Sequence, residues 1–129
     1  MNAPALQSCL LRQHAHAALT FRLDEELGTH HGLAWSDFVL LALVDEAGGA
    51  LATPELATRL GLRRSHFVLQ VLPLEKTGLV ARTIADDGSR QVALRPAGRR
   101  LLREARETAE FVCASAEGVA PSPSGRGLG

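Results

Sequence analysis

The chain has 129 residues, a length that suits one domain with a core of its own. Hydrophobic residues make up 46% of it and aromatic residues only 4%, so we expect a largely helical protein with a core of Leu, Ala and Val. The scarcity of aromatic side chains argues against binding single-stranded nucleic acid by base stacking, and no apolar run is long enough to span a membrane.

The formal net charge is zero, but it is distributed unevenly along the chain. Residues 59–106 carry 11 basic and 4 acidic side chains, a net charge of +7, whereas the remainder carries 3 basic and 10 acidic side chains. A basic central block on an acidic scaffold is typical of a module that contacts DNA.

The first two predicted elements are helices. Residues 5–27 contain no Pro or Gly and have apolar side chains at helical spacing, so they predict a long amphipathic helix that ends at Gly28. The sequence GTHHG is then expected to form a loop. A second helix is expected to begin at Trp35 or Ser36 and to end before Gly48.

Two shorter helices are expected next. In the first, Thr53 is expected to cap the free N–H groups, Pro54 suits the first helical position, and Gly61 stops the helix. The second is expected over residues 63–77. Pro73 lies inside it and should kink or shorten it, because proline removes a backbone hydrogen bond.

A β-hairpin and a last helix complete the predicted order. The strands are expected over 79–85 and 90–94, with Asp87-Gly88 in a tight turn because both residue types tolerate positive φ. A helix over about 96–114 follows. Residues 116–129 are rich in Gly, Pro and Ser and are predicted to be a disordered tail.

Two short helices followed by a β-hairpin are typical of a domain that binds duplex DNA. The second helix of a helix–turn–helix lies in the major groove with its N-terminal residues toward the base edges. In this chain those residues are Arg63, Arg64, Ser65 and His66. Arg bridges guanine O6 and N7 or grips phosphate, and Ser and His donate to either. At the hairpin, Arg90 is expected to reach the adjacent minor groove or backbone, and Arg82 to add a phosphate contact.

Five short sequence motifs carry a family resemblance. They are GLAWSDFVLLALV at 32–44, ELATRLGL at 55–62, LEKTGLV at 74–80, an Asp-led hairpin turn that ends at Arg90, and Pro96-Ala97-Gly98-Arg99. Over roughly residues 20–110 the chain thereby resembles the MarR-type winged-helix regulators. The resemblance implies a mainly α fold with a small β-hairpin wing (α+β), a winged helix–turn–helix domain over residues 1–115. It places a DNA-binding lobe at about 34–95 and dimerisation helices at about 5–27 and 96–114.

The same resemblance implies a DNA-binding transcriptional regulator. The expected protein is a repressor that acts as a homodimer on a pseudo-palindromic operator and is relieved by a small ligand. Its partners would be double-stranded DNA, a second copy of the chain and a small-molecule effector, without a cofactor. No catalytic Ser/His/Asp set, carboxylate pair or phosphate-binding glycine loop is visible in the sequence, so no enzyme is expected.

The predicted recognition helix supports an alternative interpretation, a winged-helix interaction module whose sequence-specific DNA binding is lost or weak. Val68 and Leu69 stand where members of the family usually have polar or basic side chains, and we expect them to pack inside the lobe or against a terminal arm. An apolar recognition helix could instead pack on a protein partner.

The cysteines and histidines raise the last questions. Cys9 and Cys113 form no CxxC pair and no signal peptide precedes them, which predicts a cytoplasmic protein with reduced thiols. Cys9 is similar in position to the reactive cysteine of the peroxide-sensing branch of the family, so a thiol-based redox-responsive regulator is a second alternative. Burial as an inert thiol is the competing interpretation. The histidines have no tight Cys/His ligand spacing beside them, so no metal is expected.

Overall fold

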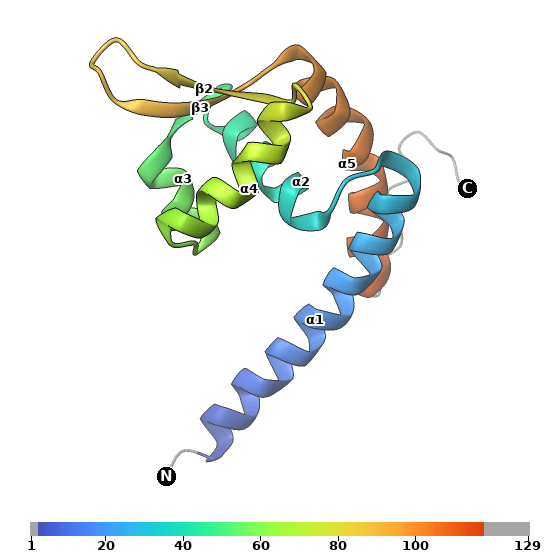
Figure 1. Ribbon diagram of the computed structural model, residues 1–129. Helices are drawn as coiled ribbons and strands as arrows, with labels where there is room; N and C mark the ends of the chain where they lie inside the picture. Colours follow the sequence, from blue (N-terminus) through green and yellow to red (C-terminus); the bar gives the residue numbers. More distant parts are fainter. Residues whose placement is uncertain (1–2, 118–129) are drawn as a thin grey trace. The chain divides into compact units, whose positions relative to one another are not determined.

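The structure, a computed structural model, describes residues 3–117 and has five helices and three strands in that range (Figure 1). In chain order they are α1 (Ala3–His31), α2 (Trp35–Glu46), β1 (Ala50–Ala52), α3 (Thr53–Leu60), α4 (Arg64–Lys76), β2 (Val80–Ile84), β3 (Arg90–Leu94) and α5 (Pro96–Ala116). No helix in the described part of the chain is long and apolar enough to cross a membrane.

The chain divides into two compact units. One, the terminal-helix unit, consists of the segments up to Trp35 and from Arg106 onwards, and the other, the winged-helix unit, is Ser36–Ala105. The mainly helical fold with a small antiparallel sheet confirms the predicted fold class.

The terminal-helix unit is built from α1 and the second half of α5. Leu23 and Leu27 of α1 and Val112 of α5 are buried, and a 2.8 Å hydrogen bond joins His31 Nε2 to Thr108 Oγ1. Residues 3–18 of α1 are exposed along their whole length. The helix therefore contributes to the core of this unit only through its C-terminal turns.

The prediction that α1 ends at Gly28 is wrong. Gly28 lies inside the helix, which continues to His31, so the GTHHG sequence is mostly helical rather than a loop. The terminator is Gly32, which has φ 65° and donates its N–H to the carbonyl of Gly28 at 3.1 Å. A glycine in a helix interior costs about 1 kcal/mol but does not end the helix, whereas the left-handed conformation does. Leu33, buried just after it, anchors the chain there.

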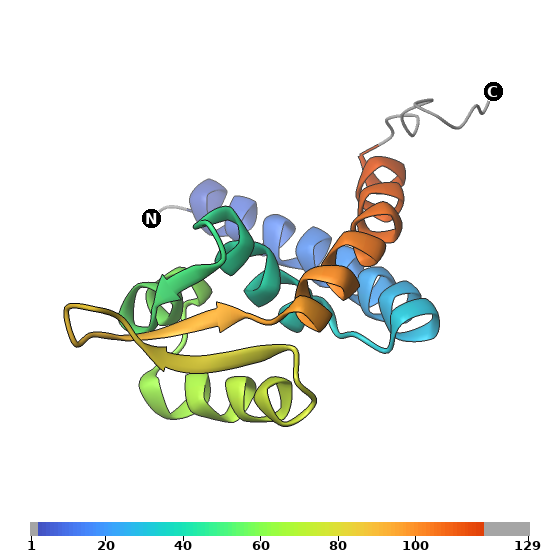
Figure 2. The ribbon, with the colours of Figure 1, turned by 90° about the horizontal axis from the view of Figure 1, so that it is seen from above.

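The winged-helix unit packs helices against a sheet of order β1-β3-β2, all antiparallel. Leu51 of β1 pairs with Val92 of β3, and Val80 of β2 pairs with Leu94. Figure 2 shows β2 and β3 extending as a hairpin, the wing, with α4 alongside β2. The buried side chains of this unit are Phe38, Leu40, Leu41, Val44, Leu51, Leu56, Phe67, Val71, Leu74, Val80, Val92, Leu94, Leu102 and Ala105.

The ends of α3 and α4 follow the sequence closely. Gly61 and Gly78 both have positive φ, 69° and 81°. In each case the glycine N–H donates a hydrogen bond to the carbonyl three residues earlier. The N–H of the following leucine, Leu62 or Leu79, donates to the carbonyl five residues earlier. This paired pattern satisfies carbonyls that the helix would otherwise leave open, and a left-handed glycine is needed to form it.

Two expectations about these helices are wrong. Thr53 does not cap α3, because it is already the first helical residue and Ala52 occupies the capping position without a side-chain hydrogen bond. Pro73 does not shorten α4, which continues to Lys76. Val71 and Leu74, on either side of the proline, are 0% and 4% exposed, and burial of these side chains outweighs one missing hydrogen bond.

The first turn of α5 lies tightly against Leu79, the residue just before β2. The carbonyl oxygen of Leu79 accepts the N–H of Arg95 at 3.0 Å. A Cβ built on Gly98 would lie 2.1 Å from that same oxygen, so only glycine fits at this position. One turn is thereby fixed to another through backbone atoms.

The end of the chain corresponds only in part to the expected tail at 116–129. Ala116 is the last residue of α5, and Glu117 forms a turn after it. The predicted disorder of 118–129 lies outside the described residues.

Candidate nucleic-acid interface

Helix α4 has a different chemistry on each of its sides. One side is apolar and fully packed, and it carries Phe67, Val71 and Leu74. A second side lines a groove toward the wing with Arg64, Val68 and Glu75. A third side is open to solvent. The helix is fixed against α2 by Gln70, whose side-chain nitrogen donates to the carbonyl of Ser36 at 2.9 Å.

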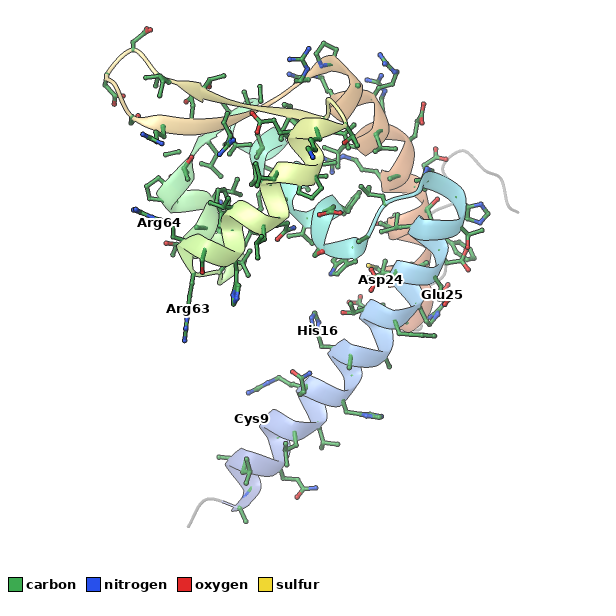
Figure 3. The ribbon with its side chains drawn as sticks, viewed as in Figure 1. Cys9, His16, Asp24, Glu25, Arg63 and Arg64 are labelled. Carbon is green, nitrogen blue, oxygen red and sulfur yellow. The ribbon has the colours of Figure 1, made fainter. Side chains whose placement is uncertain are left out.

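The four residues predicted to face DNA lie together at the N-terminal end of α4. Arg63 is the residue before the helix, and Arg64, Ser65 and His66 form its first turn. All four are exposed, and Figure 3 shows Arg63 and Arg64 at this end of the helix. Arg63 has extended backbone angles and no side-chain cap covers the free N–H groups of the first turn. In residues 3–117 neither arginine forms an ion pair, so both charges are available to a ligand.

The expectation that Val68 and Leu69 are packed holds for only one of them. Val68 is partly buried and lines the groove, whereas Leu69 is 67% exposed. Leu72, one turn further on, is 37% exposed on the same side. Leu69 points outward because Phe67 and Val71 hold the opposite side of the helix in the core.

The turn of the wing is closed by backbone hydrogen bonds between residues 85 and 89. Gly88 donates its N–H to the carbonyl of Ala85 at 2.8 Å and has φ 88°, and the N–H of Ala85 donates to the carbonyl of Ser89 at 2.8 Å. The predicted tight turn is present, but Asp87 does not adopt positive φ. Its carboxylate instead accepts the N–H of Ser89 at 2.9 Å and the hydroxyl at 2.6 Å. These hydrogen bonds lower the pKa of Asp87.

A groove of about 810 Å³ lies between the wing and α4 and is open to solvent. Its apolar lining includes Phe67, Val68, Val71 and Ile84, and its charged lining includes Arg64, Arg82 and Arg90. Arg90 is exposed at the start of β3 and forms no ion pair within the described residues. Arg82 is different, because its guanidinium bonds Glu75 Oε1 at 2.9 Å. This pair could not be predicted from the sequence, since it forms only when the hairpin packs beside the helix.

Both thiols lie in the terminal-helix unit, as do all the histidines except His66, which lies on α4. Cys9 is exposed, contrary to the expectation of a buried thiol, and its Sγ accepts a hydrogen bond from the Arg12 guanidinium at 3.3 Å (Figure 3). Burial and the nearby carboxylates of Glu110 and Glu117 raise the pKa of Cys113. Among residues 3–117 no three His, Cys, Asp or Glu side chains are grouped so that they could hold a metal ion.

Comparison with known proteins gives structural matches only. No protein-family model and no curated protein matches the sequence. AbsC, a MarR family transcriptional regulator from Streptomyces coelicolor, is 19% identical with a TM-score of 0.81, over 94% of this chain and 84% of AbsC. Sco3205, a MarR family regulator from the same organism solved in complex with DNA, is 24% identical with a TM-score of 0.78, over 90% of this chain and 74% of Sco3205.

A third structure adds a ligand complex. CouR from Rhodococcus jostii RHA1, solved with p-coumaroyl-CoA bound, is 23% identical with a TM-score of 0.78, over 89% of this chain and 81% of CouR. Each of these likenesses covers 89% or more of this chain. The chain therefore has the winged-helix fold of the MarR family transcriptional regulators.

Proposed function

We propose that the chain is a MarR-type transcriptional regulator that binds double-stranded DNA as a homodimer on a pseudo-palindromic operator. One observation carries the proposal: the exposed end of α4 presents Arg63, Arg64, Ser65 and His66 together, and Arg90 of the wing lines the groove beside them. In this role α4 enters the major groove, and the wing reaches the neighbouring backbone or minor groove. Sco3205, which has this fold, is solved in complex with DNA.

The electrostatics of the site support DNA more than any other anionic partner. Residues 59–106 carry a net charge of +7, and the arginines at the end of α4 have no carboxylate partner within residues 3–117. Duplex DNA presents a dense row of phosphates, and binding it releases condensed counterions for each phosphate that a basic side chain neutralises. The polar Ser65 and His66 beside the arginines supply donors for base edges.

Homodimerisation is proposed from the apolar surface of the terminal-helix unit. Leu6, Leu10 and Phe21 lie within about 60° of one another around the axis of α1, at 100° per residue, and are 58–65% exposed. Phe111 of α5 is 56% exposed in the same unit. Large apolar side chains in a row on a helix need a partner surface, and a second copy supplies an identical helix.

The regulatory mode is proposed as repression that a small ligand relieves. The CouR complex with p-coumaroyl-CoA supports it as an example of this fold with a small molecule bound. A cytoplasmic location follows from binding to operator DNA. AbsC and Sco3205 are regulators, which agrees with a role other than catalysis.

The experiment that tests the proposal is selection of duplex DNA from a random library by the full-length chain, followed by gel shift and light scattering. We expect an enriched pseudo-palindrome with half-sites about 10 bp apart, bound at submicromolar concentration in excess competitor DNA. The mass in solution should be twice the 13.7 kDa of one chain. A library that shows no enriched sequence would contradict DNA reading, and a monomeric mass would contradict the dimer.

The exposed Leu69 favours one alternative function, a winged-helix module that binds a protein and no longer reads DNA. The same selection separates the two functions. Retention of duplex DNA without sequence enrichment, or no retention, would favour the interaction module.

The redox alternative rests on Cys9, which is exposed on α1. If oxidation of this thiol controls DNA release, Cys9→Ser should abolish the release that peroxide causes while leaving binding under reducing conditions unchanged. The measurement is a gel shift with the selected duplex, with and without peroxide. Cys113→Ser serves as the matched control, because the raised pKa of Cys113 leaves less thiolate to oxidise. Release that persists in Cys9→Ser excludes this alternative.

A further inference from the structure

We infer that Leu69 is a specificity-determining residue of the recognition helix and that it reads the 5-methyl group of a thymine in each operator half-site. The inference rests on the proposed function, because it assigns a base contact within the proposed DNA interface. It concerns the one residue of the helix whose character least suits a surface that grips an anion.

The position of Leu69 places it among the base-facing candidates. It is the sixth residue of α4, and it follows Ser65 by four residues and His66 by three. Residues three and four apart share one side of a helix, so Leu69 continues the exposed side that begins with these two polar residues. With 67% of its surface exposed, it is the most exposed large apolar side chain of the winged-helix unit.

The chemistry of leucine restricts what it can contact in the major groove. Its side chain has no donor or acceptor, so it cannot bond to a guanine, adenine or cytosine edge. Thymine alone presents an apolar group there, the 5-methyl, and apolar side chains are known to make that contact. A leucine on the base-facing side of a recognition helix therefore selects for thymine.

The surroundings of Leu69 favour DNA over a protein as the occupant. The nearest exposed apolar neighbour on this side is Leu72, only 37% exposed, so the apolar surface is small. A stable protein interface buries about 800 Å² on each partner, whereas a single methyl contact needs one side chain. Arg63 and Arg64 flank the patch at its N-terminal end without carboxylate partners in residues 3–117, which complements phosphate charge.

The test uses the duplex that the full-length chain selects. The duplex is synthesised with thymine, and again with single thymines replaced by 2′-deoxyuridine, which lacks only the 5-methyl group. Fluorescence anisotropy at one salt concentration then gives the affinity of each duplex. Each half-site should contain one thymine whose single replacement weakens binding about fourfold, which is the effect of losing one buried methyl-sized group. Leu69→Ala should bind the thymine and uracil duplexes equally.

Two variants serve as controls. Leu72→Ala, three residues further from the N-terminal end, should keep the full preference for thymine, and Arg64→Ala should weaken binding to both duplexes by the same factor. Leu69→Ala is expected to fold, because the side chain that it removes is exposed, and circular dichroism checks this.

The outcomes separate the inference from the proposed function. If the library yields no enriched duplex, DNA reading fails and the inference fails with it. If a duplex is enriched but its half-sites lack thymine, or wild type binds the uracil duplexes equally well, only the inference is overturned. The inference alone is also overturned if Leu69→Ala retains the preference for thymine. That result would favour contact of the exposed Leu69 with a protein partner instead.

Discussion

Replacing Gly98 by alanine is expected to destabilise the winged-helix unit strongly, although alanine is the better helix former. The added Cβ would lie 2.1 Å from the carbonyl oxygen of Leu79 and 3.0 Å from its carbonyl carbon. Both are backbone atoms, and the N–H of Arg95 holds the oxygen at 3.0 Å, so no side-chain rotation relieves the clash. We expect the free energy of unfolding to fall by about 3 kcal/mol, measured by urea denaturation.

Gly28→Ala provides the matched control. Gly28 is also helical, but no atom lies within 4 Å of the Cβ that the substitution adds. There alanine should raise stability by about 0.5–1 kcal/mol, because it reduces the conformational freedom that the unfolded chain loses. The same substitution thus has opposite signs in two helices. A Gly98→Ala chain as stable as wild type would contradict the close approach of α5 to Leu79.

Arg64→Ala and Arg90→Ala are each expected to weaken binding to the selected duplex about tenfold, since each removes a charge-assisted contact. Both guanidinium groups are exposed and lack an ion pair within residues 3–117, so their full charge is available to phosphate or guanine. If the lost contact is to phosphate, the slope of log affinity against log salt should become shallower by about 0.9 for each contact. Anisotropy over a salt series measures both quantities.

Arg59→Ala is the control for these variants. Its guanidinium is bonded to Glu55 at 2.9 Å on α3, so its removal should leave the salt slope nearly unchanged. If both Arg64→Ala and Arg90→Ala keep the wild-type affinity and slope, the interface has been assigned to the wrong surface.

The sequence predicts the fold correctly where a few neighbouring residues are sufficient to determine the local structure. Gly61 and Gly78 end α3 and α4 as expected, because a left-handed glycine followed by a leucine is sufficient to close a helix. The prediction that α1 ends at Gly28 was wrong because a glycine ends a helix only when its φ is positive. The value of φ cannot be read from the sequence. The strand Ala50–Ala52 was missed because three residues give no alternation, and its pairing with β3 is a tertiary event.

The candidate site was predictable in its residues but not in their partners. The exposed end of α4 follows from the chain order, and the outward position of Leu69 could have been found by placing Phe67 and Val71 on the core side of a helical wheel. The role of Asp87 was not visible, since its carboxylate acts through Ser89 rather than through its own backbone angles.

The ion pair between Glu75 and Arg82 sets a limit on what Arg82 can contribute to binding DNA. Its guanidinium already bonds Glu75 Oε1 through both Nη2 at 2.9 Å and Nε at 3.0 Å. A phosphate would have to displace that carboxylate, which would then remain as an unpaired negative charge close to the DNA phosphates and repel them. Arg82 should therefore contact a DNA phosphate only when its guanidinium exchanges the Glu75 carboxylate for that phosphate. Removal of the Glu75 carboxylate would then tighten binding to any duplex, whatever its sequence.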